Sequence, residues 1–186
     1  MPDPKRTTIM DEEAVRLALA RMAREIVERN GGTRGLALLG IQRRGKELGE
    51  RIQREIAMAE GVEIPTGSLD ITLYRDDLAT VGPRPIVGES QLPLSGIDDH
   101  AVVIVDDVLY TGRTARAAMN ELMDWGRPSR IHLCVLIDRG GRELPIQPDV
   151  VGRRVEILGK ERVDVLVPEL DGRLAVQLVT PDEEPA

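Results

Sequence analysis

Apolar runs of strand length alternate with amphipathic helical patterns along most of this sequence, and this alternation limits the fold more than any other feature. At residues 11–30, apolar side chains recur every three to four positions, which predicts a helix with one buried face. Residues 35–41 then form a short apolar run typical of a buried strand, and residues 46–59 show a second helical pattern. Strands that alternate with helices form mostly parallel sheets covered on both faces. The sequence therefore predicts an α/β fold with a central, mostly parallel sheet flanked by helices.

The alternation continues toward the C-terminus. Residues 162–180 hold two strand-like runs around Asp171-Gly172, which predicts a β hairpin. A stretch rich in Pro and Gly indicates a flexible loop or arm at about residues 75–98. We therefore expect a single domain over residues 1–186. Further strands are expected at residues 68–75, 101–105 and 131–137, and a further helix at residues 114–125.

Composition excludes several classes of protein. Hydrophobic residues make up 41% and charged residues 31%, as in an ordinary globular protein, and no apolar run approaches the roughly 20 residues that span a bilayer. The N-terminal residues lack the apolar core of a signal peptide, and the single Cys134 cannot form an internal disulfide. We therefore expect a cytoplasmic protein without membrane contact. The net charge of −7 argues against a broadly basic surface for nucleic acid, although it allows a local basic patch.

The segment that follows the strand at residues 101–105 carries the clearest chemistry. In parallel sheets, ligands bind where strands end and helices begin. Here Asp106 and Asp107 come directly after the strand, and two adjacent carboxylates can accept hydrogen bonds from the vicinal hydroxyls of a ribose. Gly112 then opens a helix whose first N–H groups suit a phosphate, with Thr111 and Thr114 as hydroxyl donors. The alternatives are a metal-binding pair or a solvated turn, with Thr114 as an N-cap, but the order of residues favours a sugar phosphate.

The strand at residues 35–41 is followed by a segment that almost matches a nucleotide-binding P-loop. Gly40 and Gly45-Lys46 have the required spacing, but Glu47 stands where a Ser or Thr should bind Mg²⁺. We therefore disfavour a nucleoside triphosphatase. Arg43 and Arg44 fit better as ligands of a diphosphate, with a solvated loop charge as the alternative for Arg43.

Several stretches resemble a known family. VVIVDDVLYTGRT (residues 102–114) matches the phosphoribosyl diphosphate motif of type I phosphoribosyltransferases. LDITLYRDDL (69–78), GRPSRI (126–131) and VLIDRGGRELPI (135–146) are similar to the PyrR family, which comprises pyrimidine-operon attenuation proteins with uracil phosphoribosyltransferase activity. The resemblance covers most of residues 11–152. It implies a type I phosphoribosyltransferase fold with a small C-terminal β-rich hood, and a homodimer or higher homo-oligomer.

The resemblance also implies roles for individual residues. The substrates would be uracil and 5-phosphoribosyl 1-diphosphate (PRPP), with UMP as product, UMP or UTP as effector, and Mg²⁺ held by the diphosphate rather than by protein side chains alone. Asp106, Asp107 and Arg44 would be catalytic, and Asp138 and Arg139 would contact the base. The absence of an Asp at Tyr110, which purine enzymes usually carry, favours a pyrimidine, unless Tyr110 only packs over the phosphate loop. The residues expected to bind PRPP are Asp106, Asp107, Val108, Leu109, Tyr110, Thr111, Gly112, Arg113, Thr114, Arg43, Arg44 and Arg75.

A second function, RNA binding, follows from the same resemblance, with pyrimidine-operon leader mRNA as the partner. For each candidate arginine the alternative is a solvated surface charge. The sequence departs from the family's usual residues at Ala20, Arg24, Gly141 and Gln147 and after Val151, so we favour enzyme activity over RNA binding. Two further alternatives are a regulator with vestigial transferase activity and a phosphoribosyltransferase for another base. The candidate RNA-binding residues are Arg21, Arg24, Arg29, Arg142 and Arg153.

Overall fold

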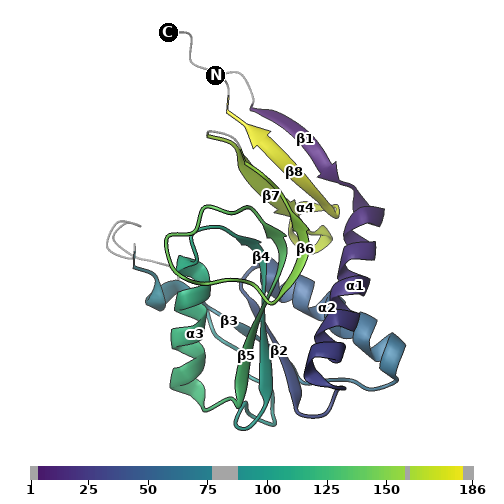
Figure 1. The fold of residues 1–186 in the computed structure, drawn as a ribbon, viewed down its shortest axis with the longest axis vertical. Coiled ribbons are helices and arrows are strands. Elements are labelled where there is room, and N and C mark those ends of the chain that lie inside the picture. The colour runs from purple at the N-terminus through teal and green to yellow at the C-terminus, as the bar shows by residue number, and fades with distance from the viewer. Residues whose placement is uncertain (1–3, 77–87, 158–159, 182–186) are drawn as a thin grey trace.

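The centre of the protein is a five-stranded sheet in which every neighbouring pair is parallel. The computed structural model describes residues 4–76, 88–157 and 160–181 (Figure 1). The strand order β3-β2-β4-β5-β6 places β4 in the middle of the sheet, and the predicted parallel α/β fold is confirmed. The strands are β2 (Leu36–Ile41), β3 (Thr66–Leu69), β4 (Ala101–Leu109), β5 (Arg130–Asp138) and β6 (Val150–Arg154).

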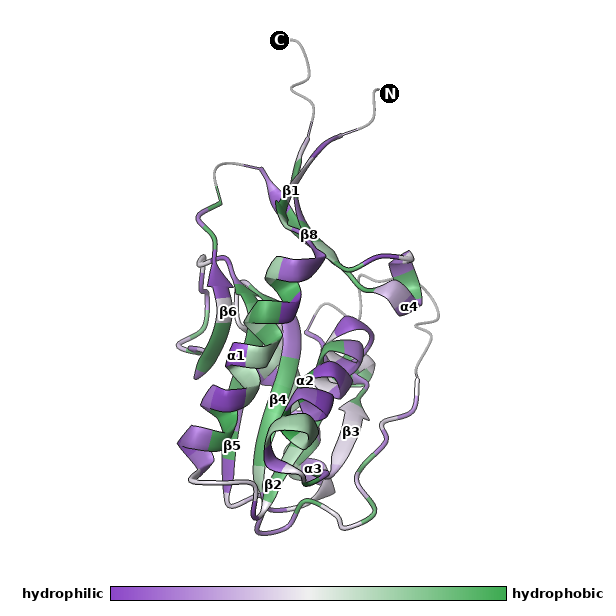
Figure 2. Ribbon diagram, turned by 90° about the vertical axis from the view of Figure 1, so that its right-hand side faces the viewer, coloured by the Kyte–Doolittle hydropathy of each residue, from purple (hydrophilic) through white to green (hydrophobic). Residues whose placement is uncertain are grey.

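Helices cover both faces of this sheet. On one face lie α1 (Glu12–Asn30) and α2 (Arg44–Glu60), and on the other lie α3 (Arg113–Trp125) and the short 3-10 helix η1 (Ile71–Tyr74). Successive residues of β4 serve the two cores in turn, because side chains alternate across a strand. Val103 and Val105 pack toward α1 and α2, whereas Val102 and Ile104 pack toward α3. Figure 2 shows the resulting hydrophobic strands between helices with hydrophilic outer faces.

The first helix forms as the sequence predicts, and its ends have clear causes. The Asp11 side chain accepts a hydrogen bond from the Ala14 N–H at 2.9 Å and caps the start of α1. Gly31 adopts a left-handed conformation with φ 72° and ends the helix. The second helix, α2, begins at Arg44, two residues before the predicted start at residue 46.

Two elements differ from the sequence prediction near the site. The strand expected at residues 68–75 ends at Leu69, because the Asp70 side chain accepts the Thr72 N–H at 3.0 Å and starts η1 instead. In contrast, β4 continues past Val105 to Leu109, so it includes both acidic residues. The predicted arm at about residues 75–98 lies partly outside the described residues.

A second, three-stranded antiparallel sheet is built from both ends of the chain. Its order is β1-β8-β7, with β1 (Lys5–Met10), β7 (Arg162–Leu166) and β8 (Ala175–Thr180). The short helix α4 (Pro168–Asp171) connects β7 to β8. We call this sheet together with α4 the hood (Figure 1). No helix in the described ranges is long and apolar enough to cross a membrane.

Candidate active site

The acidic pair lies in the last part of β4 and is largely shielded from water. Asp106 is only 6% exposed, and its Oδ1 accepts the Asp107 N–H at 2.9 Å. Asp107 Oδ1 accepts the Val108 N–H at 2.8 Å. Burial, together with the charge of Asp107, raises the pKa of Asp106 well above its ordinary value. Asp106 therefore holds its carboxylate in a poorly solvated position, where a sugar hydroxyl could donate a hydrogen bond to it.

Asp107 is affected by the same burial but has a cation nearby. Burial raises the pKa of Asp107, while the Val108 N–H and the positive charge of Arg44 act in the opposite direction. Because the net shift is upward, neither carboxylate is fully compensated by the protein itself. Polar groups that are buried without partners favour ligands that can hydrogen-bond to them.

A tight turn joins β4 to α3 and leaves the start of the helix open. Gly112 is the N-cap residue with φ 92° and offers no capping side chain, and in the first turn of α3 the Arg113 N–H donates to Thr111 Oγ1 at 3.3 Å. Thr114 lies inside the helix, so the alternative in which Thr114 is the N-cap is wrong. Uncapped N–H groups at a helix start, together with the positive end of the helix dipole, form an anion-binding position. We call residues 110–114 the phosphate loop.

The segment after β5 folds over the phosphate loop. The N–H groups of Glu143 and Leu144 donate to the Thr111 carbonyl at 3.0 and 3.1 Å. Arg142 donates to the Tyr110 carbonyl at 2.9 Å and to the Asp138 carboxylate at 2.7 Å. These bonds bring the two candidate base-binding residues, Asp138 and Arg139, next to the phosphate loop.

Tyr110 is held in place by two residues of that segment. The Arg139 guanidinium lies 4.0 Å from the centre of the Tyr110 ring, within the range of a cation–π contact. On Gly141, which has φ 73°, an added Cβ would lie only 2.3 Å from Tyr110 Cε2. The ring therefore fits only because residue 141 has no side chain.

Two glycines bring the loop after β2 into contact with β4. A Cβ on Gly45 would lie 2.4 Å from the Val105 carbonyl oxygen, and one on Gly40 would lie 2.4 Å from the Gly45 carbonyl oxygen. The spacing that imitates a P-loop thus serves close backbone packing. It places Arg44 at the start of α2, where its guanidinium forms an ion pair with Asp171 of the hood at 2.9 Å. Arg43 is exposed, and no hydrogen bond or ion pair joins its side chain to another described residue.

Arg113 and Arg75 lie at the outer edge of this region. The Arg113 side chain bonds Glu143 at 2.7 Å and also Asp76. Arg75 directly follows η1 and is exposed. The structure therefore gathers the acidic pair, the phosphate loop, Arg44, Asp138 and Arg139 around the end of β4. Arg113 ties the phosphate loop to two neighbouring segments.

Comparison with known proteins agrees with this geometry. The model of the phosphoribosyl transferase domain matches residues 5–167. "Bifunctional protein PyrR" of Herpetosiphon aurantiacus is 56% identical over 163 residues, which cover 88% of this chain and 90% of that protein. The protein of the same name from Deinococcus radiodurans is 49% identical over 183 residues, covering 98% and 99%. This chain belongs to the PyrR family of phosphoribosyltransferases.

Solved structures place the PyrR-family chain in the same fold class as more distant enzymes. The hypoxanthine phosphoribosyltransferase of Trypanosoma cruzi matches with a TM-score of 0.71 at 20% identity, over 94% of this chain and 95% of that one. The Staphylococcus aureus enzyme of the same name matches with a TM-score of 0.66 at 20% identity, over 96% and 93%. At this level of identity the likeness concerns the fold alone.

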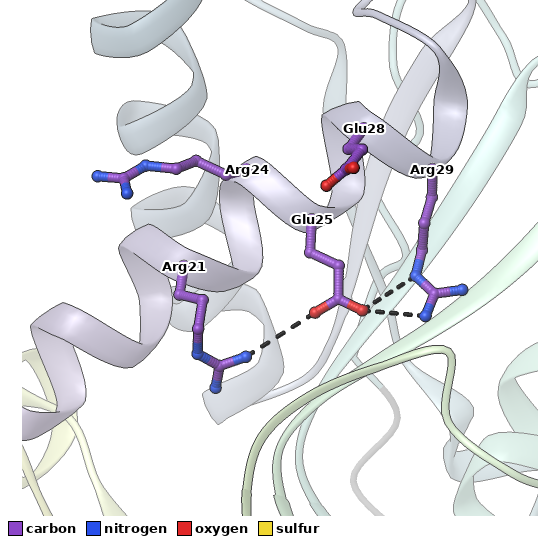
Figure 3. Close-up of a pocket in the computed structure, with 5 residues that line it drawn as sticks. All are labelled: Arg21, Arg24, Glu25, Glu28 and Arg29. Atoms are coloured by element: carbon purple, nitrogen blue, oxygen red, sulfur yellow. Dashed lines mark hydrogen bonds and ion pairs between the residues drawn. The ribbon is translucent and has the colours of Figure 1, made fainter.

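Four of the five arginines considered for RNA binding lie close together in this PyrR-family chain, because a second pocket that includes Arg29 and Arg153 adjoins the one on α1. Three of them, Arg21, Arg24 and Arg29, line an open pocket of about 540 Å³ on α1 together with Glu25 and Glu28 (Figure 3). Glu25 pairs with Arg29 at 3.0 Å and with Arg21 at 3.8 Å, whereas Arg24 points away and has no partner among the described residues. We call this pocket the arginine pocket.

Three of the five candidates bond to main-chain carbonyls, and of these Arg21 donates to the Val151 carbonyl at 3.1 Å. Arg142 holds the segment over the phosphate loop, and Arg153 donates to the Ile9 carbonyl at 2.6 Å, which ties β6 to β1 of the hood. Sequence reasoning also missed Asp171 and Glu143, which hold Arg44 and Arg113. The only signal at Asp171 was the turn pair Asp171-Gly172, which says nothing about a distant arginine.

Proposed function

We propose that this chain is a uracil phosphoribosyltransferase that forms UMP and diphosphate from uracil and PRPP, and that it also regulates pyrimidine genes by binding leader mRNA. The observation that carries the enzymatic part is the acidic pair near the end of β4, in which Asp106 is buried, followed by the glycine-capped start of α3. A ribose 5-phosphate carries both a diol and a phosphate, and it matches both features. The family and the name of the relatives support the pyrimidine assignment.

In the proposed complex, each part of PRPP meets a different element. Asp106 and Asp107 accept hydrogen bonds from the ribose hydroxyls. The phosphate loop holds the 5′-phosphate through its main-chain N–H groups and the hydroxyls of Thr111 and Thr114. The diphosphate lies toward Arg44, with Arg43 and Arg75 as exposed cations that reach it from the loop after β2 and from the end of η1. Uracil lies beside Asp138 and Arg139.

The reaction breaks the C1′–O bond to diphosphate and forms the bond from C1′ to uracil N1, whose proton passes to solvent. Positive charge develops on the ribose ring as negative charge develops on diphosphate. The acidic pair stabilises the former through the ribose, and Arg44 stabilises the latter. Mg²⁺ fits a site in which the substrate's diphosphate supplies most of the oxygen ligands, and when bound it neutralises charge on the leaving group.

A matched pair of double variants tests the enzymatic proposal. Uracil, PRPP and Mg²⁺ are incubated with the protein, and UMP and diphosphate are measured, with hypoxanthine and cytosine as competing bases. We expect UMP from uracil only, and a loss of about 1,000-fold or more in kcat/KM for Asp106→Asn with Asp107→Asn. The control is another adjacent pair, Asp98→Asn with Asp99→Asn, which is exposed and precedes the start of β4, at the opposite end of the strand. Equal activity of the two double variants would contradict the assignment of Asp106 and Asp107 to the active site.

The regulatory part rests on the arginine pocket and on the word "bifunctional" in the name of the relatives. We propose that uridine nucleotides bound at the active site modulate the affinity for leader RNA, in a cytoplasmic homodimer or higher homo-oligomer. A leader-RNA hairpin is titrated with the protein at fixed salt, with and without UMP or UTP. A dissociation constant that changes with nucleotide supports the proposal, and one that does not change contradicts it.

A further inference from the structure

The hood contacts α2 through two ion pairs of the same kind. Both acids lie on α4: Asp171 pairs with Arg44 at 2.9 Å, and Glu169 pairs with Arg51 at 2.6 Å. Arg44 is the first residue of α2, and Arg51 lies about two helical turns further along. Only the first pair therefore lies beside the active site. The second joins the same two elements without touching any proposed substrate-binding residue.

The Asp171–Arg44 pair has two contacts, which fixes the guanidinium plane. Arg44 Nη2 donates to Asp171 Oδ1 at 2.9 Å, and Arg44 Nε donates to Oδ2 at 3.3 Å. Parallel contacts of this kind orient an arginine more strictly than a single ion pair does. The carboxylate is itself anchored, because Oδ2 also accepts the Val167 N–H at 2.9 Å. Burial alone would raise the pKa of Asp171, but the Val167 N–H and Arg44 together hold that pKa below its ordinary value.

Arg44 has donors left for a ligand. A guanidinium carries five N–H groups, and Asp171 takes one from Nε and one from Nη2, so both N–H groups of Nη1 and one of Nη2 stay available. Arg44 is also close enough to Asp107 to act on its pKa. Asp171 is therefore one of two carboxylates whose charge acts on Arg44, and it is the one that Arg44 bonds.

We propose that Asp171 is a positioning residue for Arg44: the hood holds this guanidinium through Asp171 so that its remaining N–H groups face the diphosphate of PRPP. The inference rests on the proposed function, because it assumes that Arg44 binds the diphosphate. It assigns the hood a part in catalysis through one residue of α4. The simpler view is that the pair only fastens the hood to α2, as Arg51 and Glu169 do.

The two ion pairs provide matched variants that separate these views. Asp171→Asn keeps a side-chain oxygen for the Val167 N–H but removes the charge that holds Arg44. Glu169→Gln removes the equivalent charge at Arg51. If the pairs only fasten the hood, both variants should lower the thermal midpoint to a similar extent and leave the kinetics alike. If Asp171 positions Arg44, only Asp171→Asn should change the kinetics.

The measurement is UMP formation at varied PRPP and saturating uracil, together with thermal denaturation. We expect Asp171→Asn to raise KM for PRPP about tenfold and to lower kcat, because the Arg44 guanidinium would then be misplaced relative to the diphosphate leaving group. Glu169→Gln should change KM and kcat each by less than about twofold. Asp171→Glu should restore part of the loss. In an Arg44→Ala background, Asp171→Asn should have no further effect, because the two residues act as one unit.

The outcomes are distinct. Kinetics of Asp171→Asn equal to those of Glu169→Gln, or an undiminished effect of Asp171→Asn in the Arg44→Ala background, would overturn the positioning role while the proposed function stands. If the wild-type protein itself forms no UMP, the proposed function is overturned, and this inference with it.

Discussion

The end of β4 and the arginine pocket on α1 differ in what builds them. At the end of β4, main-chain N–H groups and carbonyls define the positions, glycines allow close backbone contact, and two of the acids, Asp106 and Asp138, are buried. The arginine pocket consists of long side chains on an exposed helix face, and two of its arginines share Glu25 (Figure 3). When main-chain groups build a site, a single substitution disturbs several contacts together. When exposed side chains build it, a single substitution removes only one contact.

This difference predicts how well each region tolerates substitution. Single changes at the end of β4 should therefore have large effects, and single changes in the arginine pocket should have graded ones. The following predictions test that contrast, from the largest expected effect to the smallest.

The largest effect is expected for Gly45→Ala. The new methyl group would lie 2.4 Å from the Val105 carbonyl oxygen, and backbone on both sides must move to admit it. We expect the free energy of unfolding to fall by about 3 kcal/mol and kcat/KM to fall at least ~100-fold, since Arg44 and β4 shift apart. Chemical denaturation and the UMP assay measure the two effects.

Gly49→Ala is the matched control on the same helix. Its new methyl group would find its nearest neighbours at 3.8 Å, which is ordinary contact distance. Because Ala favours a helix over Gly, stability should stay unchanged or rise by about 0.5–1 kcal/mol. If the two variants behave alike, the close approach of Gly45 does not define the site.

An intermediate effect is expected for Arg24→Ala in RNA binding. Arg24 is exposed and has no partner among the described residues, so its charge is available to a phosphate. We expect leader-RNA affinity to fall about 3- to 10-fold. The dependence of affinity on salt concentration should show the release of roughly one counterion fewer on binding. Arg130→Ala, an exposed arginine at the start of β5, is the control. A loss of 1,000-fold on Arg24→Ala would break the contrast, because it would make this exposed face as strict as the end of β4.

The smallest effect concerns stability at Asp106. Because burial and Asp107 raise the pKa of Asp106 in the folded protein, its ionisation costs folding free energy. Asp106→Asn should therefore raise the free energy of unfolding at pH 7 by about 1 kcal/mol while it lowers activity. The Asn side chain keeps an oxygen for the Asp107 N–H.

The same variant has a defined pH dependence. Below about pH 4 Asp106 is protonated in both the folded and unfolded chain, so wild type and Asp106→Asn should be equally stable. As pH rises from there through the raised pKa of the folded state, the wild type should lose stability relative to the variant. Denaturation curves between pH 4 and pH 8 measure this, and a stability difference that is independent of pH would contradict the buried charge.

Much of the fold was predictable because its signals are local. The alternation of strands and helices, the helix at α1 and the motif after β4 each lie within a continuous stretch. β1 was missed because most of its residues are exposed, so its sequence lacks an apolar face. The strand expected at residues 68–75 was wrong beyond Leu69, because one side chain, Asp70, redirects the backbone into η1.

The parts of the site that sequence did not predict depend on distant partners. Asp171 meets Arg44 across 127 positions of the chain, and Glu143 meets Arg113 across 30. No spacing rule links such residues. The near match to a P-loop is the opposite case, in which the spacing of Gly40 and Gly45 is visible in the sequence but its cause is not. That cause is close backbone packing, which only the fold reveals.

The central claim is that the end of β4 binds PRPP through its acids and the following turn. Isothermal titration of PRPP with Mg²⁺ into the wild type and into Asp106→Asn with Asp107→Asn tests it most directly, with the Asp98→Asn and Asp99→Asn protein as control. We predict one site per chain in the wild type and the control, and affinity weaker by at least ~100-fold in the first double variant. Equal affinity in all three proteins, or no binding by the wild type, would contradict the claim.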